Sequence, residues 1–534
     1  MARPSPHPTS PPLDAHNNPS PAVARRRFLA GTAATAGLLV AAAVPGAWAA
    51  PTRRLDDPFT LGVASGDPTP TGVVLWTRLA PRPLEPDGGM PGRPVRVHWE
   101  VATGPRIRNV VRRGVALAHP RFAHSVHVEV EGLDPGRAYW YRFRAEGHLS
   151  RVGRTRTAPD PGRALGRLTL AFASCQQWER GWYVAWRHLA EEDLDLVLHL
   201  GDYIYEGAGR GGGVRRHAGP EPTTLAGYRV RHAQYKTDPD LQAAHGRHPF
   251  VVTWDDHEVE NDYAGPHPAD GGDPAAFARR RAAAYRAYWE HLPIRRPPPG
   301  GANLPLYRQL TFGDLAELHV LDTRQYRDDQ ACAAAGGGQV VTCPERTDPR
   351  RSILGRSQRR WLLEGLDRSW ARWNVLAQQV LMAEVDLRLG GGRAWYSDAW
   401  DGYAADRARL LRFIARRRPA NPVVLSGDIH SFFVNDLKLD NRHEHGPVLA
   451  SEFVGTSITS GAGKYGAFAR HLPENPHIRF FESRLRGYTR CTIRPDRWHT
   501  DLRVVDSITD RDAGVRTLAR FLVEDGHPGA HRLH

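Results

Sequence analysis

The stretch LVLHLGDYIYEG, residues 196–207, decides the fold. A short apolar run ends abruptly in Gly201-Asp202, and Tyr205 follows three residues after that carboxylate. A continuous apolar run of this length is typical of a strand buried on both faces of a sheet. Because ligands in α/β folds bind at the carboxyl ends of such strands, Asp202 and Tyr205 are candidate metal ligands.

Similar runs recur along the chain, at LTLAFAS (168–174), FVVTW (250–254), AELHVLD (316–322), WNVLAQQ (373–379) and PVVLSGD (422–428). Helix-like stretches lie between them, for example YVAWRHLAEED (183–193) and AFARRRAAAYRAYWEHL (276–292). Buried strands that alternate with helices predict an α/β fold, with β-sheets covered by helices. We expect this catalytic domain to span residues 166–515.

The preceding segment, residues 57–157, has a different pattern. Val95, Val97, Trp99 and Val101 alternate with polar residues, and two later runs repeat this period of two. Such alternation with turns between the runs predicts an all-β sandwich. The stretch GLDPGRAYWYRF (132–143) resembles a turn and strand of fibronectin-type sandwiches, and a Pro/Gly-rich linker follows near 156–166.

Residues 1–50 resemble a twin-arginine signal peptide. Arg25 and Arg26 precede Phe28, an Ala-rich run follows, and Ala47-Trp48-Ala49 fits a cleavage site. An uncleaved single-pass anchor is the alternative, but the low apolarity of the run argues against a stable membrane anchor. We therefore expect export through the twin-arginine (Tat) machinery to the periplasm, cell wall or extracellular space.

Composition limits the classes of function. The chain has 534 residues, 41% of them hydrophobic, and a formal charge of +14. The basic residues are scattered instead of forming a Lys/Arg tract, which argues against a dedicated nucleic-acid binder but leaves a general attraction for anions. Of the four cysteines, Cys332 and Cys343 could close a loop disulfide in an oxidising compartment.

Four strand ends supply polar side chains that could share one site. They are Cys175 in FASCQQ, Asp202 and Tyr205 in GDYIYE, Asp255, Asp256 and His257 in TWDDHEVEND, and Asp428 and His430 in LSGDIHSFF. Each alone has a simpler explanation, such as a turn, a helix cap or a satisfied core residue. All four together predict a shared metal centre.

The order of these motifs resembles the metal-binding scaffold of calcineurin-like metallophosphoesterases. The sequence departs from the usual pattern at three positions: Tyr205 follows the Gly-Asp pair, Asp256 stands where Asn is usual, and Asp428 stands where His is usual. Tyr205 is shared with purple acid phosphatases, whereas Cys175 is not. The departures together resemble PhoD-type alkaline phosphatases, whose further motifs match LDTRQYR (321–327), ILGRSQRRWL (353–362) and WDGY (400–403).

The ligand types indicate which ions the site would hold. Thiolate and phenolate suit a trivalent iron, so Cys175, Tyr205 and His430 would surround Fe³⁺, with Asp202 bridging to neighbouring metals. Carboxylates at 255, 256 and 428 suit Ca²⁺. Iron with calcium is also what the resemblance implies. The alternatives are an inert buried thiol at 175 and an ordinary core aromatic at 205.

Two further residues are candidates for direct contact with substrate. His257 could contact a phosphate oxygen or protonate the leaving group, or it could hold a ligand carboxylate by a hydrogen bond. Arg324 could bind a phosphate by two hydrogen bonds, or it could form an ion pair with Asp322 or a neighbouring carboxylate. Asn261 is either a further ligand or a turn residue.

The resemblance implies a secreted metal-dependent alkaline phosphatase and phosphodiesterase. A metal-bound water or oxo ligand would attack phosphate mono- and diesters in line, with nucleic-acid or cell-wall polyanions as further substrates. One alternative is a two-metal esterase of the purple-acid-phosphatase type, with zinc or iron in place of calcium. Another is a non-catalytic cell-surface protein that binds a polyanion.

Overall fold

The computed structural model describes residues 55–209, 211–332, 337–441 and 445–534. The predicted signal peptide, residues 1–50, lies outside these ranges. Within them, no helix combines the length and the apolarity needed to cross a bilayer.

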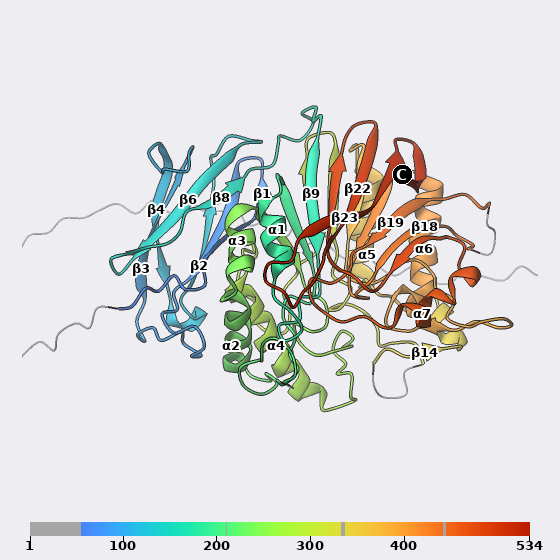
Figure 1. The fold of residues 1–534 in the computed structure, drawn as a ribbon, viewed down its shortest axis with the longest axis horizontal. Coiled ribbons are helices and arrows are strands. Elements are labelled where there is room, and N and C mark those ends of the chain that lie inside the picture. Colours follow the sequence, from blue (N-terminus) through green and yellow to red (C-terminus); the bar gives the residue numbers. More distant parts are fainter. Residues whose placement is uncertain (1–54, 210, 333–336, 442–444) are drawn as a thin grey trace, which may run out of the picture. The chain divides into compact units, whose positions relative to one another are not determined.

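A ten-stranded mixed sheet forms the first half of the α/β fold (Figure 1). Its strand order is β24 (His527–Leu533), β23 (Val515–Glu524), β22 (Arg497–Val505), β21 (Arg486–Ile493), β9 (Leu168–Ala173), β10 (Leu196–Leu200), β11 (Pro249–Thr253), β1 (Val63–Thr69), β2 (Gly72–Arg78), β5 (Ser125–Val130). Its central strands β9, β10 and β11 run parallel. Their carboxyl ends therefore meet at one edge of the sheet.

A seven-stranded sheet forms the second half. Its order is β12 (Arg308–Phe312), β13 (Ala316–Val320), β15 (Trp373–Ala377), β17 (Pro422–Ser426), β19 (Ala450–Val454), β18 (Phe432–Leu437), β20 (Ile478–Glu482). The strands β13, β15, β17 and β19 are parallel. A parallel bridge between Ser174 and Ser457 joins the carboxyl edges of the two sheets, so the strand ends converge.

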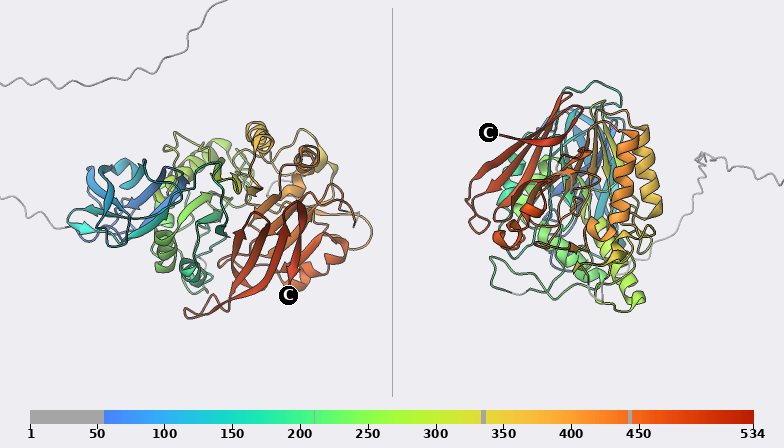
Figure 2. Two further views of the ribbon diagram at one scale, coloured as in Figure 1. Left: turned by 90° about the horizontal axis from the view of Figure 1, so that it is seen from above. Right: turned by 90° about the vertical axis from the view of Figure 1, so that its right-hand side faces the viewer.

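The sheets face each other, and helices cover their outer faces (Figure 2). Helices α1 (Val184–Glu191), α2 (Leu225–Lys236), α3 (Pro239–Arg247) and α4 (Pro274–His291) cover the first sheet, and α5 (Gly355–Arg368), α6 (Ala404–Arg417) and the short α7 (Tyr465–Ala469) cover the second. In β10, Leu196, Leu198 and Leu200 pack between the sheets while Val197 packs under the helices. Burial on both faces explains why these strands lack alternation. The α/β prediction is confirmed.

Capping residues explain where several helices begin. Asp273 accepts hydrogen bonds from the backbone N–H groups of Ala275 and Ala276, with Pro274 in the first turn of α4. Asp238 caps α3 in the same way, also with a proline after it. An acidic cap followed by proline satisfies free backbone donors and presets the helical backbone.

The segment before the α/β part consists of strands, as the alternation predicts. Strands β4 (Val110–Ala118), β3 (Val95–Ala102), β6 (Ala138–Ala145), β7 (His148–Leu149) and β8 (Gly153–Arg156) form a separate sheet, which packs on β1, β2 and β5. However, β1 pairs in parallel with β11, so one layer continues the large sheet. Residues 54–534 form one compact unit. The likeness to a fibronectin-type domain stays a prediction.

A disulfide joins Cys332 and Cys343, as the sequence allowed. It closes a loop whose end forms β14 (Val340–Val341), and β14 pairs with β16 (Trp395–Tyr396). Gly338 of this loop donates its backbone N–H to Asp262 Oδ2 at 3.0 Å. The loop is therefore attached next to the converging strand ends.

Candidate metal centre

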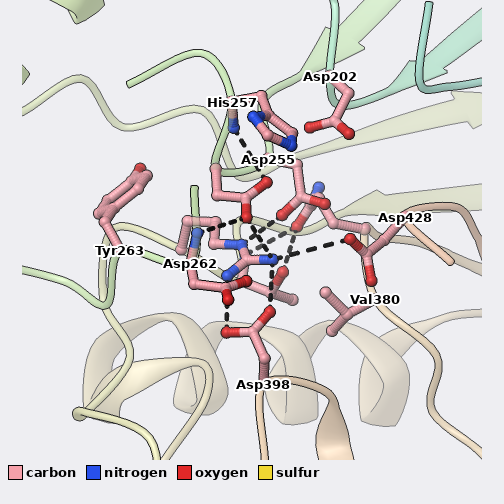
Figure 3. Close-up of polar contacts among 12 residues, drawn as sticks. Asp202, Asp255, His257, Asp262, Tyr263, Val380, Asp398 and Asp428 are labelled. Atoms are coloured by element: carbon pink, nitrogen blue, oxygen red, sulfur yellow. Dashed lines mark hydrogen bonds and ion pairs between the residues drawn. The ribbon is translucent and has the colours of Figure 1, made fainter. Parts of the chain in front are cut away.

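The four predicted segments meet where the strands end. Cys175 follows β9, Asp202 follows β10, Asp255 follows β11, and Asp428 and His430 follow β17. Figure 3 shows Asp202, Asp428 and the neighbours Asp255 and His257 directed toward one region. The structure thus brings together every predicted ligand.

On one side, a thiol, a phenol, an imidazole and a carboxylate lie around a common point. Ligand atoms of Cys175, Asp202 and His430 lie within 4.8 Å of one another. The Tyr205 hydroxyl donates to Asp202 Oδ2 at 2.7 Å and lies 3.0 Å from His430 Nε2. His430 Nδ1 is 2.7 Å from the carbonyl oxygen of Gly461, which orients the ring and leaves Nε2 directed at the site. We call this set the thiol–phenol side.

The backbone of these ligands is strained. Cys175, Asp202, Asp428 and His430 have φ values of 61°, 56°, 63° and 56°, in the left-handed region that L-residues rarely adopt. Gly201, at φ 107°, has no alternative, because a Cβ there would lie 2.4 Å from Asp255 Cβ. Strained residues persist where the surrounding structure holds them, and they cluster at functional sites.

On the other side, three carboxylates gather. Oxygen atoms of Asp255, Asp256 and Asp428 lie within 4.8 Å of one another, and a further group joins Asp256 to Asp262 and Asp398. Burial, together with neighbouring carboxylates, raises the pKa of Asp255 and of Asp428 well above the usual value. Burial has the same tendency at Asp256, but Arg324 and His257 outweigh it and lower that pKa. We call Asp255, Asp256 and Asp428 the carboxylate side.

Arg324 lies among these carboxylates and is fully buried, with no exposed surface. Its Nε pairs with Asp255 Oδ1, and its Nη1 and Nη2 contact the two oxygens of Asp398 at 2.9 and 2.8 Å. Of the two roles considered for Arg324, the structure shows the ion pair with neighbouring carboxylates. The phosphate contact stays a prediction.

His257 is placed to face a ligand in the site. Its Nδ1 is 2.7 Å from Glu206 Oε2, and 19% of its side chain is exposed. Burial tends to lower the pKa of His257, but Glu206, Asp202 and Asp256 outweigh it and raise the pKa well above the usual value. Because Glu206 occupies Nδ1, Nε2 is the atom left for a substrate. Asn261 is exposed, and its backbone N–H donates to Glu206.

Three residues that the sequence analysis missed hold the site together. Glu258 accepts backbone hydrogen bonds from Asp202 (3.1 Å), Tyr203 (2.6 Å) and Asp255 (2.9 Å), and so joins two ligand segments. The Ser460 hydroxyl lies 2.7 Å from Tyr205 Oη. Asp398 holds Arg324 and also Arg327, whose Nη1 is 2.7 Å away. Glu258 lies within the TWDDHEVEND motif, and Asp398 lies two residues before WDGY. This closeness to motifs already singled out is the only sequence feature that could have marked these two residues as part of the site.

The donor set fits bound cations. Asp202 Oδ1 and Asp255 Oδ2 are buried without a hydrogen-bond partner among the described residues, a costly state for carboxylate oxygens unless an ion satisfies them. Burial, with nearby carboxylates, raises the pKa of the Cys175 thiol and of the Tyr205 phenol well above their usual values. A cation between them would offset this repulsion and deprotonate the thiol. The donor sets of both sides therefore fit metal ions, with sulfur, nitrogen and oxygen ligands on one side and oxygen ligands alone on the other.

Comparison with known proteins identifies the family. The family model described as "PhoD-like phosphatase" matches residues 170–502, and "PhoD-like phosphatase, N-terminal domain" matches residues 45–159. Alkaline phosphatase D of Bacillus subtilis (strain 168) is 47% identical over 524 residues, which cover 95% of this chain and 89% of that protein. A solved structure titled "Structure of PhoD" superposes with a TM-score of 0.86 at 48% identity, and the match covers 90% of this chain and 92% of that one. The chain belongs to the PhoD-like phosphatase family and is a phosphoric ester hydrolase.

Proposed function

We propose that the protein is a secreted alkaline phosphatase and phosphodiesterase that works with Fe³⁺ and Ca²⁺. The observation that carries the metal assignment is the pairing of Cys175 and Tyr205 around Asp202 and His430, because thiolate and phenolate favour a trivalent iron. These four residues would hold Fe³⁺. Asp255, Asp256 and Asp428, with Asp202 shared between the two sides, would hold Ca²⁺.

Bound cations would supply two effects here: they neutralise charge on the phosphoryl oxygens and lower the pKa of a coordinated water. The chain supplies the rest. Glu206 holds the His257 ring by Nδ1, so that Nε2 can donate a proton to the departing oxygen or a hydrogen bond to the phosphate. Arg324 pairs with Asp255 and Asp398 and so offsets part of the negative charge of the carboxylates.

Export and substrate range are also part of the proposal. The twin-arginine-like segment at residues 1–50 supports export through the Tat machinery. An exported enzyme of this family would release phosphate from monoesters and cleave diesters. Nucleic-acid or cell-wall polyanions are the polymeric substrates that a formal charge of +14 would concentrate.

Metal analysis of the exported protein, purified without added metal, tests the proposal. We expect iron together with calcium, and a visible phenolate-to-iron absorption band that disappears in Tyr205→Phe. Zinc with iron would instead favour the purple-acid-phosphatase type. A folded protein that holds neither iron nor calcium, and stays inactive toward p-nitrophenyl phosphate when both are added, would refute the proposed centre.

A further inference from the structure

A groove of about 840 Å³ runs along α6, the helix that packs on the outer face of the seven-stranded sheet. Ala404, Ala408, Leu411 and Ala415 line it at spacings of four, three and four residues, which places them on one face of the helix. Small side chains on that face leave the groove open along the helix. From residue 404 to residue 416 an α-helix extends about 18 Å. A groove of this length can hold an extended ligand that carries more than one charged group.

Cationic side chains form the walls of this groove. Arg346, Arg393, Arg407, Arg409, Arg412, Arg416 and Lys438 line it, against Glu384 and Asp440. Several of these arginines are ion-paired, as Arg407 is with Asp401 at 2.6 Å and Arg409 with Asp406 at 2.9 Å. Their charge is therefore partly cancelled within the protein.

Arg412 and Arg416 differ from the other arginines. Both are exposed, and neither takes part in an ion pair or hydrogen bond with the residues that the structure describes. They stand four residues apart on α6, where two like charges destabilise a helix. A bound anion would relieve this repulsion, so the two arginines offer an uncompensated positive site on the groove wall.

The groove also adjoins the metal centre through one short segment. Asp398 of this segment contacts Arg324 at the centre, whereas Asp401, three residues later, binds Arg346 and Arg407 of the groove. Trp395 lies under Arg346, with the guanidinium carbon 3.7 Å from the ring centroid. Residues 398–401 therefore connect a side chain of the metal centre to two arginines of the groove.

We propose that this groove binds the backbone of an extended phosphodiester polymer while another part of the same chain occupies the metal centre. The inference rests on the proposed function and adds to it a second binding site, outside the metal centre, for a polymeric substrate. None of the described residues that line the groove is aromatic, so it offers no aromatic ring on which bases would stack. Recognition would come from the phosphates and would depend on salt.

Fluorescence anisotropy with a fluorescein-labelled, phosphorothioate-linked 12-mer of oligothymidylate tests this binding. In Arg412→Glu/Arg416→Glu we expect the Kd to rise at least about tenfold at 50 mM salt. The slope of log Kd against log salt should fall by about 1.4, which is about 0.7 for each of two lost phosphate contacts. The matched control is Arg96→Glu/Arg113→Glu, which changes the net charge equally on exposed positions of the N-terminal strands.

Equal losses in both variants, or no loss in the groove variant, would overturn the proposal, as would a wild-type protein that does not bind the probe. Inorganic tripolyphosphate and unlabelled 12-mer are compared as competitors of the probe. If tripolyphosphate competes more strongly, and this competition is absent in the groove variant, the groove is a site for small free anions and the proposal is overturned. Turnover separates this inference from the proposed function. We expect kcat/KM for p-nitrophenyl phosphate to be unchanged in the groove variant. A wild-type protein that does not hydrolyse this ester would refute the proposed function, but the anisotropy result on polymer binding would still hold.

Discussion

The two sides of the metal centre solve the problem of buried charge differently. On the thiol–phenol side, Cys175 and Tyr205 are neutral groups whose pKa values are raised, so that side gains negative charge when a cation arrives. On the carboxylate side, Arg324 already lies against Asp255 and 3.5 Å from Asp256. The carboxylate side therefore contains a guanidinium in direct contact with its carboxylate oxygens, whereas the four residues of the thiol–phenol side include none.

Removal of the residue that both sides share should have the largest effect. Asp202 belongs to the group with Cys175 and His430 and to the group with Asp256 and His257. We expect Asp202→Asn to lower kcat/KM for p-nitrophenyl phosphate by about 10⁴-fold, since a lost metal contact costs several kcal/mol of transition-state stabilisation. Both metals should decrease in metal analysis.

The matched control is Asp193→Asn, at an exposed position outside the site, which should leave activity and metal content unchanged. An Asp202→Asn protein that loses iron but keeps calcium would show that the two sides do not share this ligand.

Loss of the internal cation should destabilise the fold. Arg324→Met leaves buried carboxylates without their partner, and we expect the free energy of unfolding to fall by about 3–5 kcal/mol. Added Ca²⁺ should restore part of the loss, because a bound ion can replace the missing charge. Urea denaturation with and without Ca²⁺ measures both effects.

Arg327→Met serves as the control, because Arg327 pairs only with Asp398 within this acidic group. If both variants lose the same stability, or if Ca²⁺ restores neither, Arg324 is not the cation on which the carboxylate side depends.

The phenol should matter for only one side. Tyr205→Phe removes one hydroxyl from the thiol–phenol side, and we expect kcat to fall about 10²-fold, a change of about 2.7 kcal/mol in the barrier. The visible absorption band should disappear while calcium remains. Tyr203→Phe is the control, since its hydroxyl contacts His245 instead of the site, and it should keep its colour. Calcium loss in Tyr205→Phe would contradict the division into two sides.

The smallest effect is expected at the support of His257. Glu206→Gln should lower kcat about tenfold, within the range for residues that orient a reacting group. The loss should be larger for alkyl phosphates than for p-nitrophenyl phosphate, because poor leaving groups depend more on proton donation. Equal losses for both esters would indicate a purely structural role. Glu221→Gln, at an exposed position, should change neither rate.

The sequence predicted those features that depend on local pattern. The buried strands, the helices near 183–193 and 276–292 and the convergence of the candidate ligands at strand ends follow from periodicity and from the rule for strand ends. The ion pairs of Arg324 do not follow from such a pattern, because their partners Asp255 and Asp398 lie in segments far from it in the sequence. The pairing of β1 with β11 joins residues more than 180 positions apart, and no local pattern reports such a contact. Glu258 acts on backbone groups of other segments, which is visible only in three dimensions.

The strained backbone at Cys175, Asp202, Asp428 and His430 has a consequence for how the site tolerates substitution. Hydrogen bonds from other segments, those of Glu258 and Ser460 among them, hold these loops in a conformation that their own residues disfavour. The geometry of the candidate ligands is therefore not a local property of their segments. A change at a supporting residue would alter that geometry while every candidate ligand stays in the sequence.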